Sequence, residues 1–261
     1  MGNVYELGIA TTEDEATRLK VLNFPLEASK KLLLKCGIRG KKVLDIGAGP
    51  SISLEEFVQE LGGYYLACDI SSTFLLERKK VGFSQTVQVD NTSLPFADDS
   101  FDFTHTRIVL AHLSFERRAQ AIKESVRVAS QKSLMLEWNW KTFKGGEAIS
   151  EFVNWSLKFF EQTGFNPFLG ESLETEVINV VDKQPVNEYI FRRKPGNYYH
   201  EVIPLAETFL SVGKKLKGKK FESGFIDQLE SLIGFLNEEK NKQTFTPPDL
   251  VAVEVIKYDN K

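Results

Sequence analysis

Three aspartates stand at the ends of three separate apolar stretches, where their side chains could hold a polar ligand. They are Asp45, Asp69 and Asp90. Each carboxylate offers two oxygens that accept hydrogen bonds or face a positive charge. If the apolar stretches are neighbouring parallel strands, the strand ends meet at one edge of a sheet, where ligands bind in open α/β folds. The pattern therefore predicts one site in which all three acids hold the same ligand.

A glycine turn follows the first of these acids. Gly47, Ala48 and Gly49 separate a predicted strand, 42–46, from a predicted helix, 52–61. Glycine lets the backbone approach a ligand where a Cβ would collide, and the helix N-terminus would lie beside the same crevice. A carboxylate before the turn disfavours an anionic pyrophosphate and favours S-adenosylmethionine (SAM), which carries an ammonium and a sulfonium. The dinucleotide pattern G-x-G-x-x-G also fails, because its third glycine is replaced.

Two blocks of sequence resemble the class I SAM-dependent methyltransferases. The run Val43–Ser51 resembles the family's first motif, (V/L)LD(I/V)GxGxG, except that Ser51 replaces its last glycine. That replacement is tolerable if Ser51 opens the following helix as its cap. The run Asp90–Asp102 matches the block D-x-x-x-L-P-F-x-D-x-S-F-D at every specified position. This ordered set is the most specific signal in the chain.

Each acid then has an expected role. Asp45 would face the cationic end of SAM. Asp69 follows the glycines by roughly 20 residues, a spacing suited to an acid that accepts hydrogen bonds from a ribose diol, and Ile70 follows it. The resemblance implies that Asp90 binds the adenine amino group and that Asn91 supplies a backbone donor to the ring. An alternative for Asp69 is a capping role at the next helix.

The fourth predicted strand, 101–106, and the segment after it, 107–113, carry the candidate catalytic groups. The segment 107–113 resembles the family segment R-x-V-L-x-H-L, which lies behind SAM. Arg107 is expected to line the cofactor pocket or to bond backbone carbonyls there. His105 and His112 are two of three histidines, and a histidine can act as a general base near neutral pH. We name both as candidate bases, and packing is the alternative for each.

Alternating strand and helix signals predict an α/β fold with a Rossmann-like, doubly wound, mostly parallel sheet. The resemblance implies seven strands, the last one antiparallel. We expect a single domain over residues 1–261, with a helical lid (1–40), a SAM-binding core (41–145) and a substrate-covering C-terminal part with helices and closing strands (146–261). Within the lid, Tyr5 and Arg18 are expected to face the cofactor, and Pro25 to divide two helices.

The C-terminal part is expected to cover the acceptor. Its predicted helices span 148–162, 198–216 and 221–239, a strand pair is predicted at 176–181 and 187–192, and the closing strand at 250–258. Trp138 and Trp140 could hold a flat or lipophilic substrate at the pocket edge or pack in the core.

Composition limits the function classes. The chain has 261 residues, 42% of them hydrophobic, and a net charge of −3, which disfavours a nucleic-acid partner. No apolar run has the roughly 20 residues of a membrane span, and the first twelve residues lack a signal-peptide pattern. Two cysteines in apolar surroundings indicate a reducing compartment, so we expect a cytoplasmic protein. No Cys/His cluster has metal-ligand spacing, and the oligomeric state is open.

The leading hypothesis is a methyltransferase that uses SAM, leaves S-adenosylhomocysteine (SAH), and acts on a small-molecule acceptor by positioning and in-line displacement. One alternative is a SAM-binding enzyme of the same fold that catalyses another reaction, and a second is a nicotinamide-dependent oxidoreductase. A third is a non-catalytic adaptor. Nothing in the sequence selects oxygen, nitrogen or carbon as the accepting atom.

Overall fold

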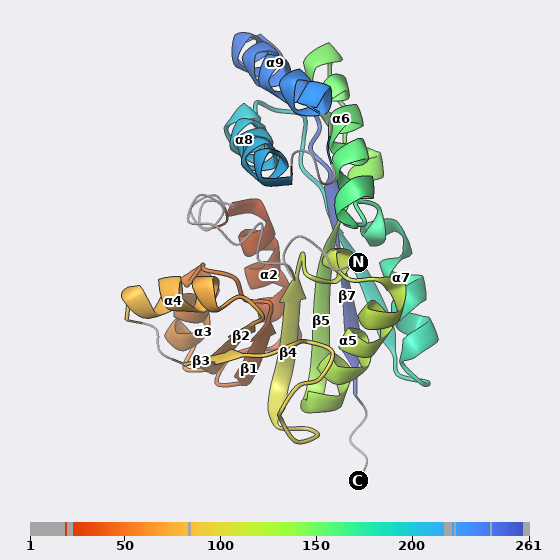
Figure 1. The fold of residues 1–261 in the computed structure, drawn as a ribbon. Helices are drawn as coiled ribbons and strands as arrows, with labels where there is room; N and C mark the ends of the chain where they lie inside the picture. Colours follow the sequence, from red (N-terminus) through yellow and green to blue (C-terminus); the bar gives the residue numbers. More distant parts are fainter. Residues whose placement is uncertain are drawn as a thin grey trace.

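A seven-stranded sheet organises the molecule, seen in a computed structural model that describes residues 19, 23–82, 85–216, 221, 223–240 and 242–257 (Figure 1). The strand order is β3-β2-β1-β4-β5-β7-β6. The strands β1 to β5 are parallel, while β7 lies antiparallel between β5 and β6. Their bounds are Lys42–Ile46, Tyr64–Asp69, Thr86–Gln88, Phe101–Arg107, Ala129–Asn139, Val186–Phe191 and Asp249–Ile256 for β1 to β7. The predicted sheet is confirmed.

The central strands are buried on both faces because helices cover both. The helices α2 (Asn23–Cys36) and α3 (Ser53–Glu60) share a core with one face. The helices α5 (Phe115–Val128) and α7 (Leu169–Val180) share a core with the other. The helix α4 (Ser72–Lys80) packs against β2 and β3. Strands covered in this way are buried continuously rather than at alternate positions.

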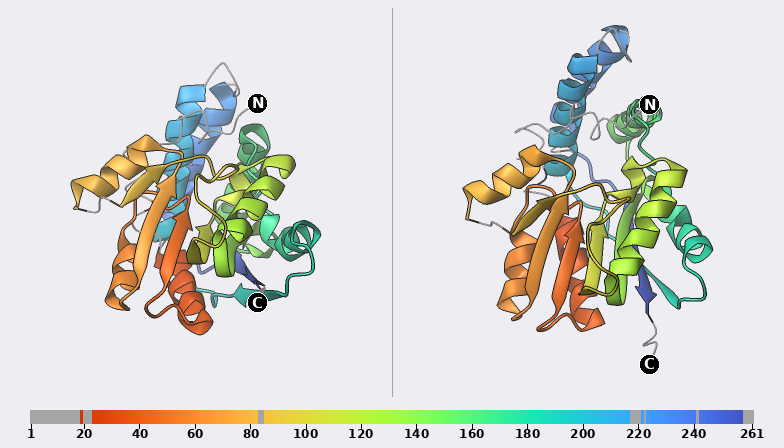
Figure 2. Two further views of the ribbon diagram at one scale, coloured as in Figure 1. Left: turned by 90° about the horizontal axis from the view of Figure 1, so that it is seen from below. Right: turned by 60° about the horizontal axis from the view of Figure 1, so that its bottom comes forward.

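Three helices form a roof beyond the carboxyl edge of the sheet. They are α6 (Glu147–Thr163), α8 (Tyr199–Leu216) and α9 (Ser223–Glu239), close to the predicted ranges. Figures 1 and 2 show α8 and α9 standing above the strand ends rather than against a sheet face. These helices bury an aromatic core of their own, and Phe209 stacks on Phe152 and Phe159 within it. The sheet and the roof are therefore two packing units that meet at the strand ends.

The predicted strand at 176–181 is wrong, because this stretch ends helix α7 and β6 pairs with β7 instead. Its β-branched residues favour a strand locally. Over a longer stretch, Leu169, Leu173 and Val177 recur every four residues and are buried against α5 and the sheet. Helical spacing and tertiary packing together outweigh the local preference.

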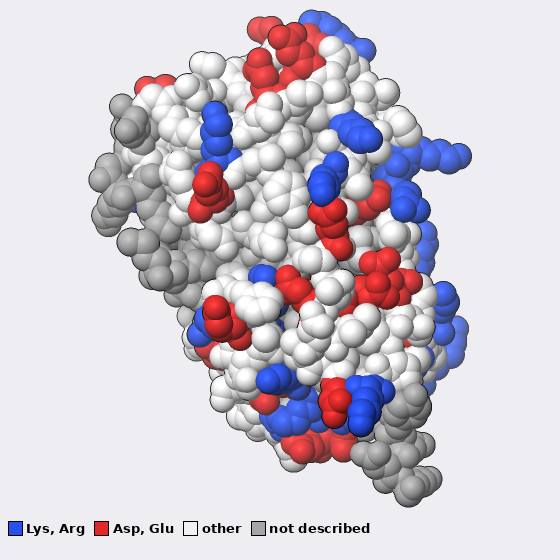
Figure 3. Space-filling model, turned by 90° about the vertical axis from the view of Figure 1, so that its right-hand side faces the viewer, with Lys and Arg blue, Asp and Glu red and all other residues white. Residues whose placement is uncertain are grey.

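Pro25 lies in the first turn of α2, where a missing N–H costs no helical hydrogen bond. Most of the predicted helix before it lies outside the described residues. Among the described residues, no helix is long and apolar enough to cross a bilayer. On the face in Figure 3, acidic and basic side chains are interspersed rather than gathered by sign.

Candidate functional site

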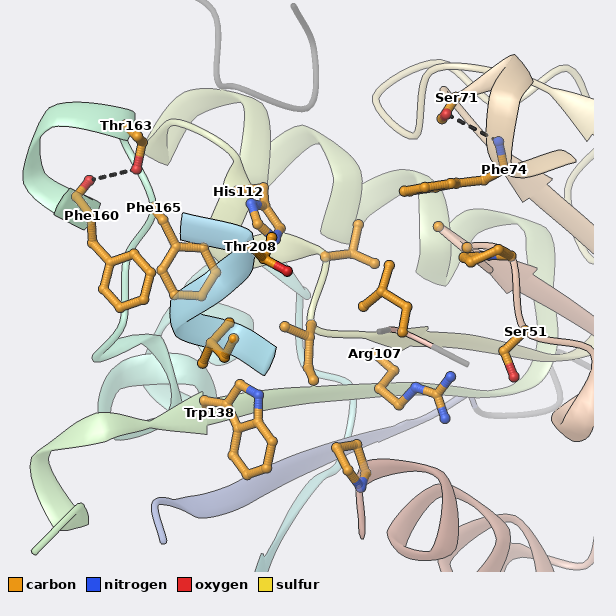
Figure 4. A pocket seen from close by; sticks show the side chains of 18 of the residues that line it. Ser51, Ser71, Phe74, Arg107, His112, Trp138, Phe160, Thr163, Phe165 and Thr208 are labelled. Atoms are coloured by element: carbon orange, nitrogen blue, oxygen red, sulfur yellow. Dashed lines mark hydrogen bonds between the residues drawn. The ribbon is translucent and has the colours of Figure 1, made fainter. Parts of the chain in front are cut away.

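A cavity of about 280 Å³ opens where the strand ends face the roof. Figure 4 shows side chains from both units pointing into it. The sheet side contributes the glycine turn, the start of α4 and the segment after β4, while the roof contributes residues of α6 and α8. The predicted site residues that line the cavity are Gly47, Ala48, Gly49, Asp69, Ile70, Asn91, Arg107 and His112.

The glycine turn needs glycine at its first position. Gly47 has φ +72°, a left-handed conformation, and a Cβ built there would lie 2.4 Å from a methyl carbon of Val109. The N–H groups of Gly47 and Ala48 both donate to the Cys68 carbonyl, at 2.8 and 3.0 Å. These bonds tie the turn to the end of β2 and bring it beside Asp69. The turn is thus a fixed wall of the cavity.

Asp69 is oriented by two backbone donors. Its Oδ2 accepts from the Gly49 N–H at 2.9 Å, and its Oδ1 accepts from the Ser71 N–H at 2.8 Å. Burial raises the pKa of Asp69 above its ordinary value, although these two hydrogen bonds oppose the rise. The cap of α4 is Ser71, whose hydroxyl accepts from the Phe74 N–H. Asp69 therefore has further acceptor capacity toward the cavity.

Ser51 does not cap α3, which corrects the sequence expectation. The N-cap is Ile52, without a side-chain hydrogen bond. Instead, the Ser51 carbonyl accepts from Nη1 of Arg78, a residue with no exposed surface. Nη2 of Arg78 donates to Oε2 of Glu55 at 2.5 Å. A buried arginine of α4 therefore fixes both the turn and the start of α3.

Asp45 of β1 and His105 of β4 direct their side chains toward the α2 side of the sheet and do not line the cavity. Oδ1 of Asp45 is 2.8 Å from Nδ1 of His105, and Nε2 of His105 is 2.9 Å from the Ser29 hydroxyl of α2. Tyr65 donates its hydroxyl to Oδ2 of Asp45. Burial raises the pKa of Asp45, but His105 and then Arg107 outweigh this effect, so the pKa lies below its ordinary value.

This placement changes the chemistry open to both residues. Asp45 is 3% exposed and His105 is 0% exposed, and neither lines the cavity. A base must reach the proton it removes. We therefore leave His105 out of the proposed catalysis. Asp45 does not touch the cavity, so it can act on a bound ligand only through its negative charge.

Asp90 is held by neighbours at the far end of the site. Oδ1 accepts from the backbone and hydroxyl of Thr92, and Oδ2 accepts from Nη2 of Arg117 at 2.9 Å. Desolvation raises the pKa of Asp90, but these hydrogen bonds lower it overall. Asn91 and Arg117 line the cavity, whereas Asp90 does not. Of the three acids, Asp69 is the one in the wall.

Arg107 ends β4 and faces the cavity beside the glycine turn, on the side toward Ser51 (Figure 4). Its Nη1 is buried without a hydrogen-bond partner among the described residues. Burial lowers the pKa of Arg107, and the nearby Asp45 charge opposes this. The guanidinium thus supplies a positive charge next to the turn.

Comparison with known proteins finds a family model that matches part of the chain and solved structures that share its fold. Residues 44–136 match the model of the methyltransferase domain family. No curated protein matches the sequence. Among the solved structures that share the fold is the YcgJ protein of Bacillus subtilis, with 17% identity and a TM-score of 0.57 over 90% of this chain and 100% of that chain. Another is an Anabaena variabilis protein assigned as a methyltransferase of an antibiotic biosynthesis pathway, with 15% identity and a TM-score of 0.59 over 87% of this chain and 96% of that chain. Haemonchus contortus phosphoethanolamine N-methyltransferase 2, in complex with phosphomonomethylethanolamine and SAH, has 15% identity and a TM-score of 0.52 over 88% of this chain and 52% of that chain.

The chain has the fold of the class I methyltransferases, and residues 44–136 match the family's domain model. The matched region contains the glycine turn, Asp69, Asp90 and both candidate histidines. Tyr5 and Arg18 precede the matched region and lie outside the described residues, so their predicted role in the lid stays a prediction.

Glu137, in β5, has a supporting role that was not predicted from the sequence. It is fully buried in β5, and its Oε1 accepts from the N–H groups of Val109 and Leu110 at 2.9 and 2.7 Å. These bonds hold the short 3-10 helix η1 (Leu110–His112) that places His112 in the cavity wall. A charged residue inside an apolar strand signal was the clue available in the sequence.

His112 lies against the segment that follows α6. Its ring packs on Phe165 with centroids 4.7 Å apart, and Thr208 of α8 lines the same cavity. This position borders both the sheet side and the roof side of the cavity. His112 therefore stays a candidate base.

Replacing Glu137 with Gln should flatten the pH dependence of stability. Burial raises the pKa of Glu137 from 4.5 to about 7, although hydrogen bonds from Leu110 and Val109 oppose this. Between these values the unfolded chain binds fewer protons than the folded one, so the free energy of unfolding falls as pH rises. The stability of Glu137→Gln relative to the natural protein should rise by about 2–3 kcal/mol between pH 4 and pH 8.

Urea unfolding at a series of pH values measures this difference. The amide keeps the oxygen that accepts the two N–H groups, so the fold is expected to persist. Glu161→Gln, on the exposed side of α6, is the matched control and should follow the pH curve of the natural protein. Parallel curves for Glu137→Gln and the natural protein would refute the shifted ionisation.

Proposed function

We propose that this protein transfers a methyl group from SAM to a small, partly apolar acceptor molecule. One observation carries the proposal: a single cavity joins the glycine turn and Asp69 to an aromatic chamber under the roof. A donor and an acceptor could meet inside it with water excluded. Bringing two reactants together in this way is the main contribution required for a displacement on an activated carbon.

The residues at the sheet side fit the donor. Gly47 allows the turn to stay in the cavity wall, since a Cβ there would collide with Val109, and Asp69 keeps acceptor capacity for a ribose diol. Asn91 and Arg117 line the end where the adenine ring is expected. Arg107 offers its guanidinium near the turn, where the carboxylate of the amino-acid part would need a cation. SAM, when bound, supplies a methyl group activated by its sulfonium.

The roof side fits the acceptor. Its wall includes rings of Trp138, Phe160, Phe165 and Phe209, which suit an apolar body. His112 is placed to accept a proton from an acceptor group. The similar structures also support a small acceptor, since one is assigned to antibiotic biosynthesis and one holds a phosphorylated amine. We further propose that the protein works in the cytoplasm without nucleic acid as substrate.

Calorimetry with SAH and with NADH tests the donor. We expect SAH to bind and NADH not to bind, and binding of NADH alone would refute the proposal. Incubation with SAM labelled at its methyl group, in the presence of a metabolite extract, tests transfer. Label should move to a small molecule. Label that stays on SAM despite SAH binding would favour the alternative of another reaction on the same fold.

A further inference from the structure

One arginine lies at the acceptor end of the cavity in an otherwise largely aromatic setting. Arg193 follows β6, and its side chain is 10% exposed. Its guanidinium lies between two rings, 4.5 Å from the centroids of both Phe24 and Tyr198. The rings come from α2 and from the segment just before α8. Such a sandwich holds the cation in one orientation.

The hydrogen bonds of Arg193 are incomplete. Nη1 donates to both carboxylate oxygens of Glu201, at 2.7 and 2.9 Å. Nε is buried and has no hydrogen-bond partner among the described residues, and no contact there engages Nη2. Arg193 and Glu201 both line the cavity. Buried donors are nearly always satisfied in folded proteins, so an unmet donor in a cavity wall points to a ligand.

We propose that the Nε–Nη2 edge of Arg193 binds a carboxylate on the acceptor, which makes the substrate an apolar acid. The inference rests on the proposed function and names its substrate class. The two donors on this edge match the two oxygens of a carboxylate. The aromatic wall beside it accommodates the apolar body. Arg193 therefore sets acceptor specificity and takes no part in the chemical step.

The carboxylate of SAM is a second possible source of the same group, and position favours the acceptor. Arg193 follows β6, which stands four strand positions from β1 and its glycine turn. At about 4.8 Å per strand, this separation is roughly 19 Å at the strand ends. Arg107 ends β4, the strand next to β1. The donor carboxylate thus has a nearer cation.

Matched acids and amides test the proposal directly. Phenylacetate, phenylpropanoate and phenylbutanoate, each with its primary amide, are titrated at millimolar concentration into the SAH-loaded protein and followed by ligand-observed NMR. The acids should bind about tenfold more tightly than their amides. Arg193→Gln should abolish that preference.

Glu201→Gln separates recognition from structure. It keeps an oxygen for Nη1 but removes a negative charge beside the proposed anion, so acid binding should strengthen several-fold. If the ion pair were purely structural, Arg193→Gln and Glu201→Gln would both weaken acid binding. Thermal melting of each variant checks the fold. Because stronger acid binding is expected for Glu201→Gln, the proposal can still be tested if Arg193→Gln folds poorly.

Several outcomes would overturn the inference. These are equal binding of acids and amides, no binding of any acid, or an acid preference that persists in Arg193→Gln. Weaker binding of SAH by Arg193→Gln, with unchanged binding of methylthioadenosine, which lacks the carboxylate, would assign Arg193 to the donor instead. Failure of SAH to bind the natural protein would reject the proposed function itself, whereas SAH binding without acid binding would reject the inference alone.

Discussion

Arg78→Met should destabilise the fold by about 3–5 kcal/mol, the range for breaking a buried ion pair. The variant leaves the carboxylate of Glu55 buried without its partner, 2.5 Å from where Nη2 stood. It also removes the donor that holds the Ser51 carbonyl of the glycine turn. Burial already raises the pKa of Glu55, and losing the cation would raise it further. Urea denaturation at neutral pH measures the loss.

Two variants control this experiment. Lys79→Met changes the next residue of α4, which is exposed, and should alter stability by less than about 0.5 kcal/mol. The double variant Arg78→Met/Glu55→Gln removes the stranded charge and should recover part of the loss. If Arg78→Met is as stable as Lys79→Met, the buried pair of Arg78 and Glu55 does not stabilise the fold.

Asp69→Ala should weaken SAH binding by about 1.5–3 kcal/mol, the range for a hydrogen bond to a charged group, or roughly 10- to 150-fold. The carboxylate lines the cavity and is held by the N–H groups of Gly49 and Ser71. Calorimetry with SAH measures the effect. Asp98→Ala, an exposed acid outside the cavity, is the control and should bind SAH as the natural protein does.

Part of the loss in Asp69→Ala would come from the freed backbone of the glycine turn. Asp69→Asn separates the two contributions, because its amide oxygen can still accept from one N–H while the charge is gone. We expect an intermediate affinity for SAH. Unchanged binding in Asp69→Ala would mean that the ribose lies elsewhere.

The order of elements could be read from the sequence because each signal is local. The strand ranges 42–46 and 64–69 agree with β1 and β2, and the roof helices lie where helical spacing predicted them. The position of Asp69 in the wall followed from the same reasoning, since it ends a strand at the ligand edge of a parallel sheet. The prediction was wrong at 176–181, where a local β preference was outweighed by helical packing.

Side-chain direction could not be read in this way. Asp45 belongs to a strand buried on both faces, so no alternation indicated whether it faced the cavity or α2. Arg78 begins a run of three basic residues that looks like a solvated helix end, yet it is fully buried. Each outcome depends on a partner 23 residues away or more, Glu55 for Arg78 and His105 for Asp45.

The sequence by itself determined the sheet, the glycine turn and an acid at the ligand edge, because these follow from periodicity and from residue types a few positions apart. Only the tertiary structure decided which charges meet. It paired the His105 side chain with Asp45 on the α2 side of the sheet, and it set Arg193 between Phe24 and Tyr198 in the cavity wall. The physical reason is that burial and pairing of a charge depend on segments far apart in the chain, and no local pattern records which of them come together.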